Sequence, residues 1–267
     1  MVALAGLESH DSVRLRAVGE ALRESLSNTV SVEEKRIISL IEKRRSSLLY
    51  SDKEITVIDF GAGSSSSNRT KEEMEAGVIS TVFVSDVCKA SMPRFWATFL
   101  FKLIRKLEPL SCVELGSCVG ISASYQAASL SMNGKGRLVT LEGSQEIAKI
   151  AQETLEWLGL RNVSVVTGSF RETMKSVLDS AKPIDFFFND GHHDHDAVLK
   201  YFDDAFPSLS EDAVVVFDDI SWSPGMRKAW AAIEHDERVA ASISLRKLGI
   251  AFIGNNYASK ERFRIPL

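Results

Sequence analysis

The chain has 267 residues, of which 45% are apolar and 25% are charged, and its formal net charge at pH 7 is -4. This length fits one large domain, or one domain with an appendage. The composition is that of an ordinary globular protein and excludes the disordered, collagen-like and disulfide-scaffold classes. The mildly acidic balance argues against a general nucleic-acid binder, which would carry a basic excess.

The cysteines and the apolar runs bear on location. Cys88, Cys112 and Cys118 are odd in number and contain no CxxC pair, which favours a reducing compartment over a disulfide framework or a zinc site. The N-terminus has no basic region followed by an apolar core, and apolar runs such as 213–217 fall far short of the roughly 18 residues of a membrane helix. We therefore expect a soluble, cytoplasmic protein with no membrane partner.

The first fifty residues predict helices. Apolar residues recur at three- and four-residue steps through 7–26 and again through 37–49. The basic cluster 43–45 in the second helix is expected on a solvated face, with phosphate contact as the alternative.

A short strand is predicted next, with a loop and a third helix after it. The apolar run from Ile55 leads into the segment Phe60-Gly-Ala-Gly63 and a serine-rich loop at 64–68. The Gly-containing segment is similar to a nucleotide-binding turn, but no helical pattern follows it directly, so we expect no contact with a cofactor. Residues 95–107, after Pro93, predict a helix with an apolar face.

Strands and helices alternate from residue 111 onward. This alternation predicts βαβ crossovers and an α/β, doubly wound, mostly parallel sheet, whose ligands lie at the carboxyl ends of the strands. The predicted strands are 112–115, 137–142, 163–167, 184–189, 213–217, 239–245 and 249–253, and the predicted helices are 121–130, 145–158, 171–178, 196–206 and 226–234.

The first of these strands ends in Glu114-Leu-Gly-Ser-Cys-Val-Gly-Ile-Ser122. Gly116 permits a tight turn, and Gly120 permits close approach of the backbone to a ligand at the start of a helix. The helix N-terminus, with Ser122 in its first turn, favours an anionic group such as a carboxylate. The alternative is a plain strand–helix turn, which also uses glycine.

The next two strands end in residues suited to a nucleoside. Glu142, followed by Gly143, is placed to accept hydrogen bonds from both hydroxyls of a ribose, although it could simply precede the next helix. Ser169 and Phe170 would border an adenine ring, with a helix cap at Ser169 as the alternative.

The fourth and fifth strands end in histidines and carboxylates. The loop Asn189-Asp-Gly-His-His-Asp-His-Asp196 holds three of the five histidines, and Asp194 or Asp196 could cap the helix that follows. Asp218 and Asp219 would repel each other unless a cation or a proton lies between them. With Asp190 from the neighbouring strand they suit Mg²⁺; alternatively, Asp219 caps a helix and no metal binds.

Together these motifs resemble the class I S-adenosylmethionine-dependent methyltransferases, and among them the metal-dependent catechol and macrolide or aminocoumarin sugar O-methyltransferases. The resemblance covers residue 111 to the C-terminus and implies a Rossmann-like, seven-stranded sheet whose last strand is antiparallel. It divides the chain into an N-terminal helical cap, 1–110, that selects the acceptor, and a cofactor-binding methyltransferase domain, 111–267. Alternatively, the apolar N-terminal helices could form a homodimer interface, which is common among these enzymes.

The resemblance also implies residue roles. Gly116 and Gly120 would frame the methionine part of the cofactor, and His192 would pack on its adenine. His193 stands where the catechol family has a basic lysine and would take a proton from the acceptor. The implied cofactor-binding residues are Glu114, Gly116, Ser117, Gly120, Ser122, Glu142, Gly143, Ser169, Phe170, Asp190 and His192; the implied Mg²⁺ ligands are Asp190, Asp218 and Asp219; and the implied catalytic residues are His193, His192 and Asp190.

The function we expect is Mg²⁺-assisted transfer of a methyl group from S-adenosyl-L-methionine to a hydroxyl of a small phenol, catechol or glycoside, as in natural product biosynthesis. The alternatives are a metal-independent N- or C-methyltransferase of the same fold and a non-catalytic cofactor-binding protein. Four aromatic residues could shape an acceptor slot, although such residues more often pack in a core: Phe95, Trp96, Phe170 and Trp222.

Overall fold

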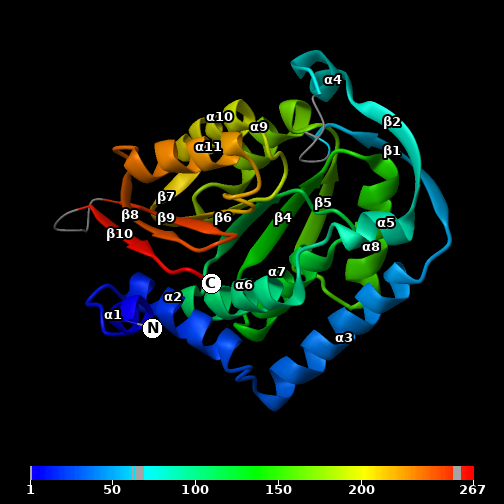
Figure 1. The fold of residues 1–267 in the computed structure, drawn as a ribbon. Coiled ribbons are helices and arrows are strands. Elements are labelled where there is room, and N and C mark those ends of the chain that lie inside the picture. Colours follow the sequence, from blue (N-terminus) through cyan, green and yellow to red (C-terminus); the bar gives the residue numbers. More distant parts are fainter. Residues whose placement is uncertain (1, 62, 64–68, 255–259) are drawn as a thin grey trace.

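An eight-stranded sheet lies at the centre of the computed structural model, which describes residues 2–61, 63, 69–254 and 260–267 (Figure 1). The strand order is β10-β8-β9-β7-β6-β3-β4-β5, and β9 is antiparallel to both of its neighbours, whereas the other pairs are parallel. The strands are β3 (Ser111–Leu115), β4 (Arg137–Glu142), β5 (Val163–Thr167), β6 (Ile184–Asn189), β7 (Leu209–Phe217), β8 (Val239–Ser244), β9 (Gly249–Ile253) and β10 (Glu261–Arg264).

The doubly wound, mostly parallel architecture is confirmed, and the number of strands is corrected from seven to eight. The antiparallel strand is β9, the last of the seven predicted strands. The additional strand, β10, pairs with β8 in parallel at the edge of the sheet. Its sequence, Glu-Arg-Phe-Arg, has one apolar residue in four, so it carries no apolar run that could mark it as a strand.

Helices cover both faces of the sheet because the central strands are apolar on both sides (Figure 1). Phe186 and Phe188 of β6 belong to the same buried cluster as residues of α7 and α8, whereas Phe187 packs with residues of α9, α10 and α11. The helices are α7 (Ile121–Met132), α8 (Gln145–Trp157), α9 (Phe170–Ala181), α10 (His195–Ala205) and α11 (Pro224–His235), with a 3₁₀ turn at Phe206–Ser208.

Residues 1–110 contain the short strand predicted from Ile55 and a second strand, at 78–83, that was not predicted. A two-stranded antiparallel hairpin, β1 and β2, stands beside α8 (Figure 1). Its second strand has exposed or half-buried residues throughout, so no two-residue alternation of buried positions marks it. The elements are α1 (Val2–Glu8), α2 (Val13–Leu26), α3 (Val32–Leu49), β1 (Glu54–Asp59), α4 (Lys71–Ala76), β2 (Val78–Phe83), α5 (Val84–Lys89) and α6 (Arg94–Leu107).

A buried lysine fixes α6 against the first helices. The Lys102 ammonium lies 2.7 Å from a Glu34 carboxylate oxygen on α3 and 2.9 Å from one of Glu24 on α2. The basic cluster on α3 is less solvated than predicted. Arg45 pairs with Glu42 at 3.0 Å, and Arg44 donates a hydrogen bond to Thr154 Oγ1 at 3.2 Å.

In the described part of the chain, no helix has the length and apolar character that a membrane span requires.

The sheet places its functional crevice between β3 and β6. Strand β3 continues to β4 on one side and lies next to β6 on the other, so the connections after β3 and β6 leave the sheet in opposite directions. The two loops touch there. Gly116 has a φ of +94°, and a Cβ atom on it would lie 2.4 Å from the Asp190 carbonyl oxygen, so glycine is required.

Candidate active site

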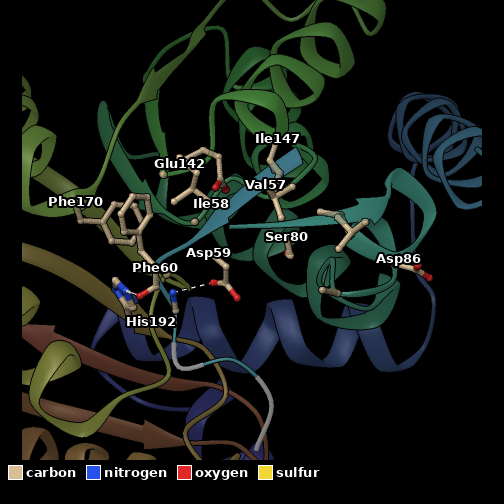
Figure 2. A pocket seen from close by; sticks show the side chains of 17 residues that line it. Val57, Ile58, Asp59, Phe60, Ser80, Asp86, Glu142, Ile147, Phe170 and His192 are labelled. Atoms are coloured by element: carbon tan, nitrogen blue, oxygen red, sulfur yellow. Dashed lines mark hydrogen bonds between the residues drawn. The ribbon is translucent and has the colours of Figure 1, made fainter. Parts of the chain in front are cut away.

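A cavity of 380 Å³ opens at the carboxyl ends of β3 and β4, next to the loop after β6 (Figure 2). Gly116, Glu142, Gly143, Phe170 and His192, five of the predicted cofactor-binding residues, line it. The remaining wall comes from the N-terminal hairpin and from α5 with the residue after it, while α8 adds Ile147 and the loop after β6 adds Gly191. These other lining residues are Val57, Ile58, Asp59, Phe60, Gly61, Ser80, Val82, Asp86, Val87, Ala90, Ile147 and Gly191.

Glu142 is the principal acidic group in the wall of this cavity. Its carboxylate accepts hydrogen bonds from the backbone N–H groups of Cys118, at 2.9 Å, and Ser144, at 3.0 Å. Burial raises the pKa of Glu142 to about 7. A carboxylate has about four lone-pair sites, so these two backbone donors leave capacity for two further hydroxyl donors.

Three residues at the junction of β3 and α7, Glu114, Ser117 and Ser122, lie behind the cavity wall rather than in it. The buried Glu114 carboxylate accepts hydrogen bonds from Gln126 Nε2 at 2.6 Å and from Thr140 Oγ1 at 2.5 Å. Burial raises the pKa of Glu114 to about 7, although the Thr140, Ser122 and Gln126 side chains act in the opposite direction. Ser117 hydrogen-bonds with Thr140 at 2.6 Å. Glu114, Ser117 and Ser122 thus tie the loop to α7 and β4.

Gly120 is needed for the packing of α7 against α8. A Cβ atom there would lie 3.0 Å from the Cα atom of Ala151 on α8, and the φ of Gly120 is +84°. Glycine therefore lets the start of α7 approach α8 closely. This contact, between two helices, is different from the predicted approach of the Gly120 backbone to a ligand.

The hairpin segment, for which no cofactor contact was expected, forms one wall of the cavity that the predicted cofactor-binding residues line. Phe60 lies at the end of the cavity where Phe170 and His192 also gather (Figure 2). Its ring is so close to Gly143 that a Cβ atom on that glycine would lie 2.7 Å from the ring. Of the Phe60–Gly63 segment, position 62 lies outside the described residues, as does the serine loop at 64–68.

Both ring nitrogens of His192 are engaged. Nε2 contacts the Phe60 carbonyl oxygen, which can only accept, so Nε2 carries the proton and donates it. Nδ1 then accepts a hydrogen bond from the Tyr201 hydroxyl at 2.6 Å. Burial lowers the pKa of His192, in keeping with this neutral form. His192 is therefore part of the cavity wall and is a poor candidate for a base, although the sequence had placed it among the catalytic residues.

Of the two predicted site residues that follow β5, Phe170 lines the cavity and Ser169 lies at the N-terminus of α9. Phe170 lines the cavity, and a Cβ atom on Gly191 would lie 2.2 Å from its ring. Ser169 lies at the N-terminus of α9, but its hydroxyl donates to the Glu172 carboxylate at 2.8 Å and makes no capping hydrogen bond with the backbone.

Asp190, Asp218, Asp219 and His193 meet beside the cavity, as the strand-end argument predicted. His193 Nε2 lies 3.5 Å from Asp190 Oδ1 and 3.7 Å from Asp219 Oδ2. One ligand atom each of Asp190, His193 and Asp218 lie within 4.8 Å of one another, which is a spacing that a metal ion could bridge. Asp219 is not a helix cap, because Ser223 caps α11 by accepting from the Met226 N–H.

Lys247, in the turn between β8 and β9, is a member of this cluster that the sequence argument missed. Its ammonium lies 2.9 Å from Asp218 Oδ2 and 2.5 Å from Asp219 Oδ1. Burial lowers the pKa of Lys247, but the two carboxylates outweigh that effect and raise it overall. Asp219 reaches this ion pair from a left-handed backbone conformation, with a φ of +50°, which aspartate tolerates better than most residues.

Several other polar atoms of the cluster are buried without a hydrogen-bond partner among the described residues, so they are available to bind a ligand. Asp218 Oδ1, His193 Nε2 and both side-chain polar atoms of Asn189 are buried, and none has a hydrogen-bond partner among the described residues. Burial raises the pKa of Asp190 to about 7, and burial together with the Asp190 charge raises that of Asp218 well above its usual range. Burial lowers the pKa of His193.

A second cavity, of 500 Å³, adjoins the far side of this cluster. Phe95, Trp96, Asp219 and Lys247 line it, whereas Trp222 packs against the His193 ring at 5.3 Å between centroids. The four aromatic residues proposed for one slot are therefore divided, because Phe170 lines the first cavity. Asp219 lines this second cavity, and Asp190 and His193 are the sequence neighbours of Gly191 and His192, which line the first.

The central part of the chain is similar to a known domain family. Residues 113–220 match the model of a methyltransferase domain family. A curated catechol O-methyltransferase from Niastella koreensis is 29% identical over 124 residues, which are 46% of this chain and 54% of that protein. The chain thus spans about half the length of this curated relative.

Solved structures agree in fold. An O-methyltransferase from Bacillus cereus, in complex with S-adenosylhomocysteine, is 24% identical with a TM-score of 0.53, and the match covers 61% of this chain and 82% of that one. The O-methyltransferase TomG of Streptomyces achromogenes, involved in tomaymycin synthesis and bound to S-adenosylmethionine, is 23% identical with a TM-score of 0.53, covering 62% and 82%.

Residues 113–220 thus match a methyltransferase domain, and the doubly wound sheet is shared with solved methyltransferase structures. The curated relative and both of these solved structures are named O-methyltransferases, which agrees with the resemblance of the strand-end motifs.

Proposed function

We propose that the protein transfers a methyl group from S-adenosyl-L-methionine to a hydroxyl oxygen of a small-molecule acceptor, a phenol, catechol or glycoside. The observation that carries this proposal is the cluster of Asp190, His193 and Asp219: the first two directly flank Gly191 and His192 of the first cavity, and Asp219 lines the second. One cavity offers a carboxylate and a glycine-rich wall suited to the cofactor, and the other offers an aromatic wall suited to an acceptor.

His193 is the residue we propose as base. Its lowered pKa keeps the imidazole neutral at neutral pH, so it can take the acceptor's hydroxyl proton as the oxygen attacks the methyl carbon. The carboxylates of Asp190 and Asp219 lie close enough to orient the ring and to stabilise the imidazolium that results. The S–CH₃ bond breaks as the O–CH₃ bond forms, and S-adenosylhomocysteine leaves.

We further propose Mg²⁺ assistance, with Asp190, Asp218 and Asp219 as the ligands that the resemblance implies. The unpartnered Asp218 Oδ1 and the close grouping of Asp190, His193 and Asp218 fit a divalent cation. When bound, such an ion would lower the pKa of the acceptor hydroxyl and fix its direction. Imidazole suits transition metals better than Mg²⁺, so a preference for Mg²⁺ would leave His193 free as the base.

Metal removal tests this part of the proposal. We expect turnover to fall at least about tenfold after treatment with EDTA and to return with Mg²⁺, because the ion would polarise the acceptor oxygen. Binding of S-adenosylhomocysteine, measured by calorimetry in EDTA, should be preserved, since the cofactor cavity lies beside the cluster. Full turnover in EDTA would instead favour metal-independent methyl transfer, for which the Lys247 ammonium beside Asp218 and Asp219 is the supporting observation.

Substitution of Glu142 tests the cofactor cavity. Glu142→Gln should weaken binding of S-adenosylhomocysteine by about tenfold to a hundredfold, because charge-assisted hydrogen bonds to the ribose are lost. Calorimetry measures the affinity. Glu153→Gln, an exposed carboxylate on α8, is the matched control and should bind like the wild type. If Glu142→Gln and the wild type bind S-adenosylhomocysteine with equal affinity, Glu142 does not bind the ribose.

We also propose a cytoplasmic location, a role in natural product biosynthesis and a homodimer. Cys88, Cys112 and Cys118 are all free, and two are buried, which suits a reducing compartment. The similarity in fold to an O-methyltransferase of tomaymycin synthesis supports the second point. The third rests on the resemblance and is tested by light scattering.

A further inference from the structure

Lys247 provides a positive charge at the place where a divalent cation would be needed. The ammonium contacts Asp218 Oδ2 at 2.9 Å and Asp219 Oδ1 at 2.5 Å, and the Lys247 side chain is 20% exposed. Asp218 is 3% exposed, so its ionised form is hidden from water and is stabilised by a nearby positive group. Lys247 pairs with both carboxylates at once.

The position of Lys247 is fixed by the fold. Strands β8 and β9 pair antiparallel up to Ser244 and Gly249, and the tight turn between them carries Lys247. The Ile220 N–H donates to the Lys247 carbonyl oxygen at 3.0 Å, which joins this turn to the loop that follows β7. The backbone therefore holds the lysine next to Asp218 and Asp219.

We propose that Lys247 is a built-in counter-cation of the Asp218–Asp219 pair and that it competes with a divalent cation for their oxygens. This inference rests on the proposed metal site. An ammonium and a divalent ion repel each other strongly at the short separations that a shared carboxylate imposes. A metal ion must therefore displace Lys247 from at least one carboxylate, and the wild-type protein should bind divalent cations weakly.

The test is the affinity for Mn²⁺ alone, followed by electron paramagnetic resonance of the free ion and by calorimetry. Lys247→Met should bind Mn²⁺ at least about tenfold more tightly than the wild type, because a repulsive charge is removed. Lys247→Gln keeps a polar side chain, should show the same direction, and serves if the methionine variant does not fold. Lys247→Met combined with Asp218→Asn should lose the gain, which would locate the ion at this pair.

Arg246→Met is the matched control, since it removes one positive charge from the neighbouring exposed position and leaves Lys247 in place. Its Mn²⁺ affinity should remain within about twofold of the wild type, because water and salt screen an exposed charge. Equal Mn²⁺ affinity of wild type, Lys247→Met and Lys247→Gln, or no binding by any of them, would overturn the proposal.

Binding of S-adenosylhomocysteine to the same variants separates this inference from the proposed function. If S-adenosylhomocysteine binds but the Lys247 substitutions leave the Mn²⁺ affinity unchanged, the competition is disproved and the proposed methyltransferase function is unaffected. If the Lys247 substitutions raise the Mn²⁺ affinity but S-adenosylhomocysteine does not bind, the competition is supported and the proposed function is disproved.

Discussion

Replacing Asp190 by asparagine is expected to lower kcat/KM for methyl transfer by about a thousandfold or more. Asp190 Oδ1 lies 3.5 Å from His193 Nε2, so the substitution removes the nearest negative charge that would stabilise the protonated base. It also removes one of the three proposed metal ligands. The two losses act on the same proton-transfer step, so the rate should fall far more than the affinity for S-adenosylhomocysteine.

The comparison variant is Asp204→Asn on the exposed side of α10, where the carboxylate pairs with Lys200 at 2.7 Å. It removes the same charge from a surface position and should keep kcat/KM within about twofold, since exposed ion pairs contribute little. Steady-state kinetics with a catechol acceptor and calorimetry with S-adenosylhomocysteine provide the two readouts. Asp190→Asn with more than a tenth of wild-type activity would contradict the assigned role.

Substituting alanine for Gly116 is expected to destabilise the fold by about 3 kcal/mol or more. A Cβ atom at this position would lie 2.4 Å from the Asp190 carbonyl oxygen, and the φ of +94° is unfavourable for any residue with a side chain. The backbone after β6 must move away to admit the methyl group. We therefore expect weaker binding of S-adenosylhomocysteine as well.

Gly134→Ala separates conformational strain from collision. Gly134 also has a positive φ, +68°, but a Cβ atom there would meet nothing within 4 Å. Its cost should be about 1 kcal/mol, from the left-handed backbone alone. Urea unfolding monitored by circular dichroism measures both variants. Equal losses for the two would show that the contact between the loops after β3 and β6 is unimportant.

The sequence predicted the sheet well because the signals of buried parallel strands are local. Runs such as Phe186-Phe-Phe188 and Ala213-Val-Val-Val216 are apolar throughout, and both lie in the centre of the sheet. Their carboxyl ends must meet at one edge, so Asp190, Asp218 and Asp219 could be grouped without coordinates.

The missing parts depend on contacts between distant segments. Phe60 reaches the cavity because β1 pairs with β2 and packs beside α8, and no periodicity in residues 55–61 specifies that placement. Lys247 follows a strand that was predicted, yet a single lysine in a turn is ordinarily a solvated residue. The engagement of both His192 nitrogens depends on Phe60 and Tyr201, which lie 132 and 9 residues away in sequence.

The apolar contacts of α6 have a consequence for how the chain folds. Leu22 of α2, Leu103 of α6, and Ala127 of α7 belong to one continuous buried cluster, which also includes Phe186 and Phe188 of β6. Residues 1–110 and the sheet therefore share a core, and we expect them to form and unfold in a single cooperative transition. The limit at residue 110 marks a change of sequence pattern, and a chain severed there would expose the apolar side of α7 to water.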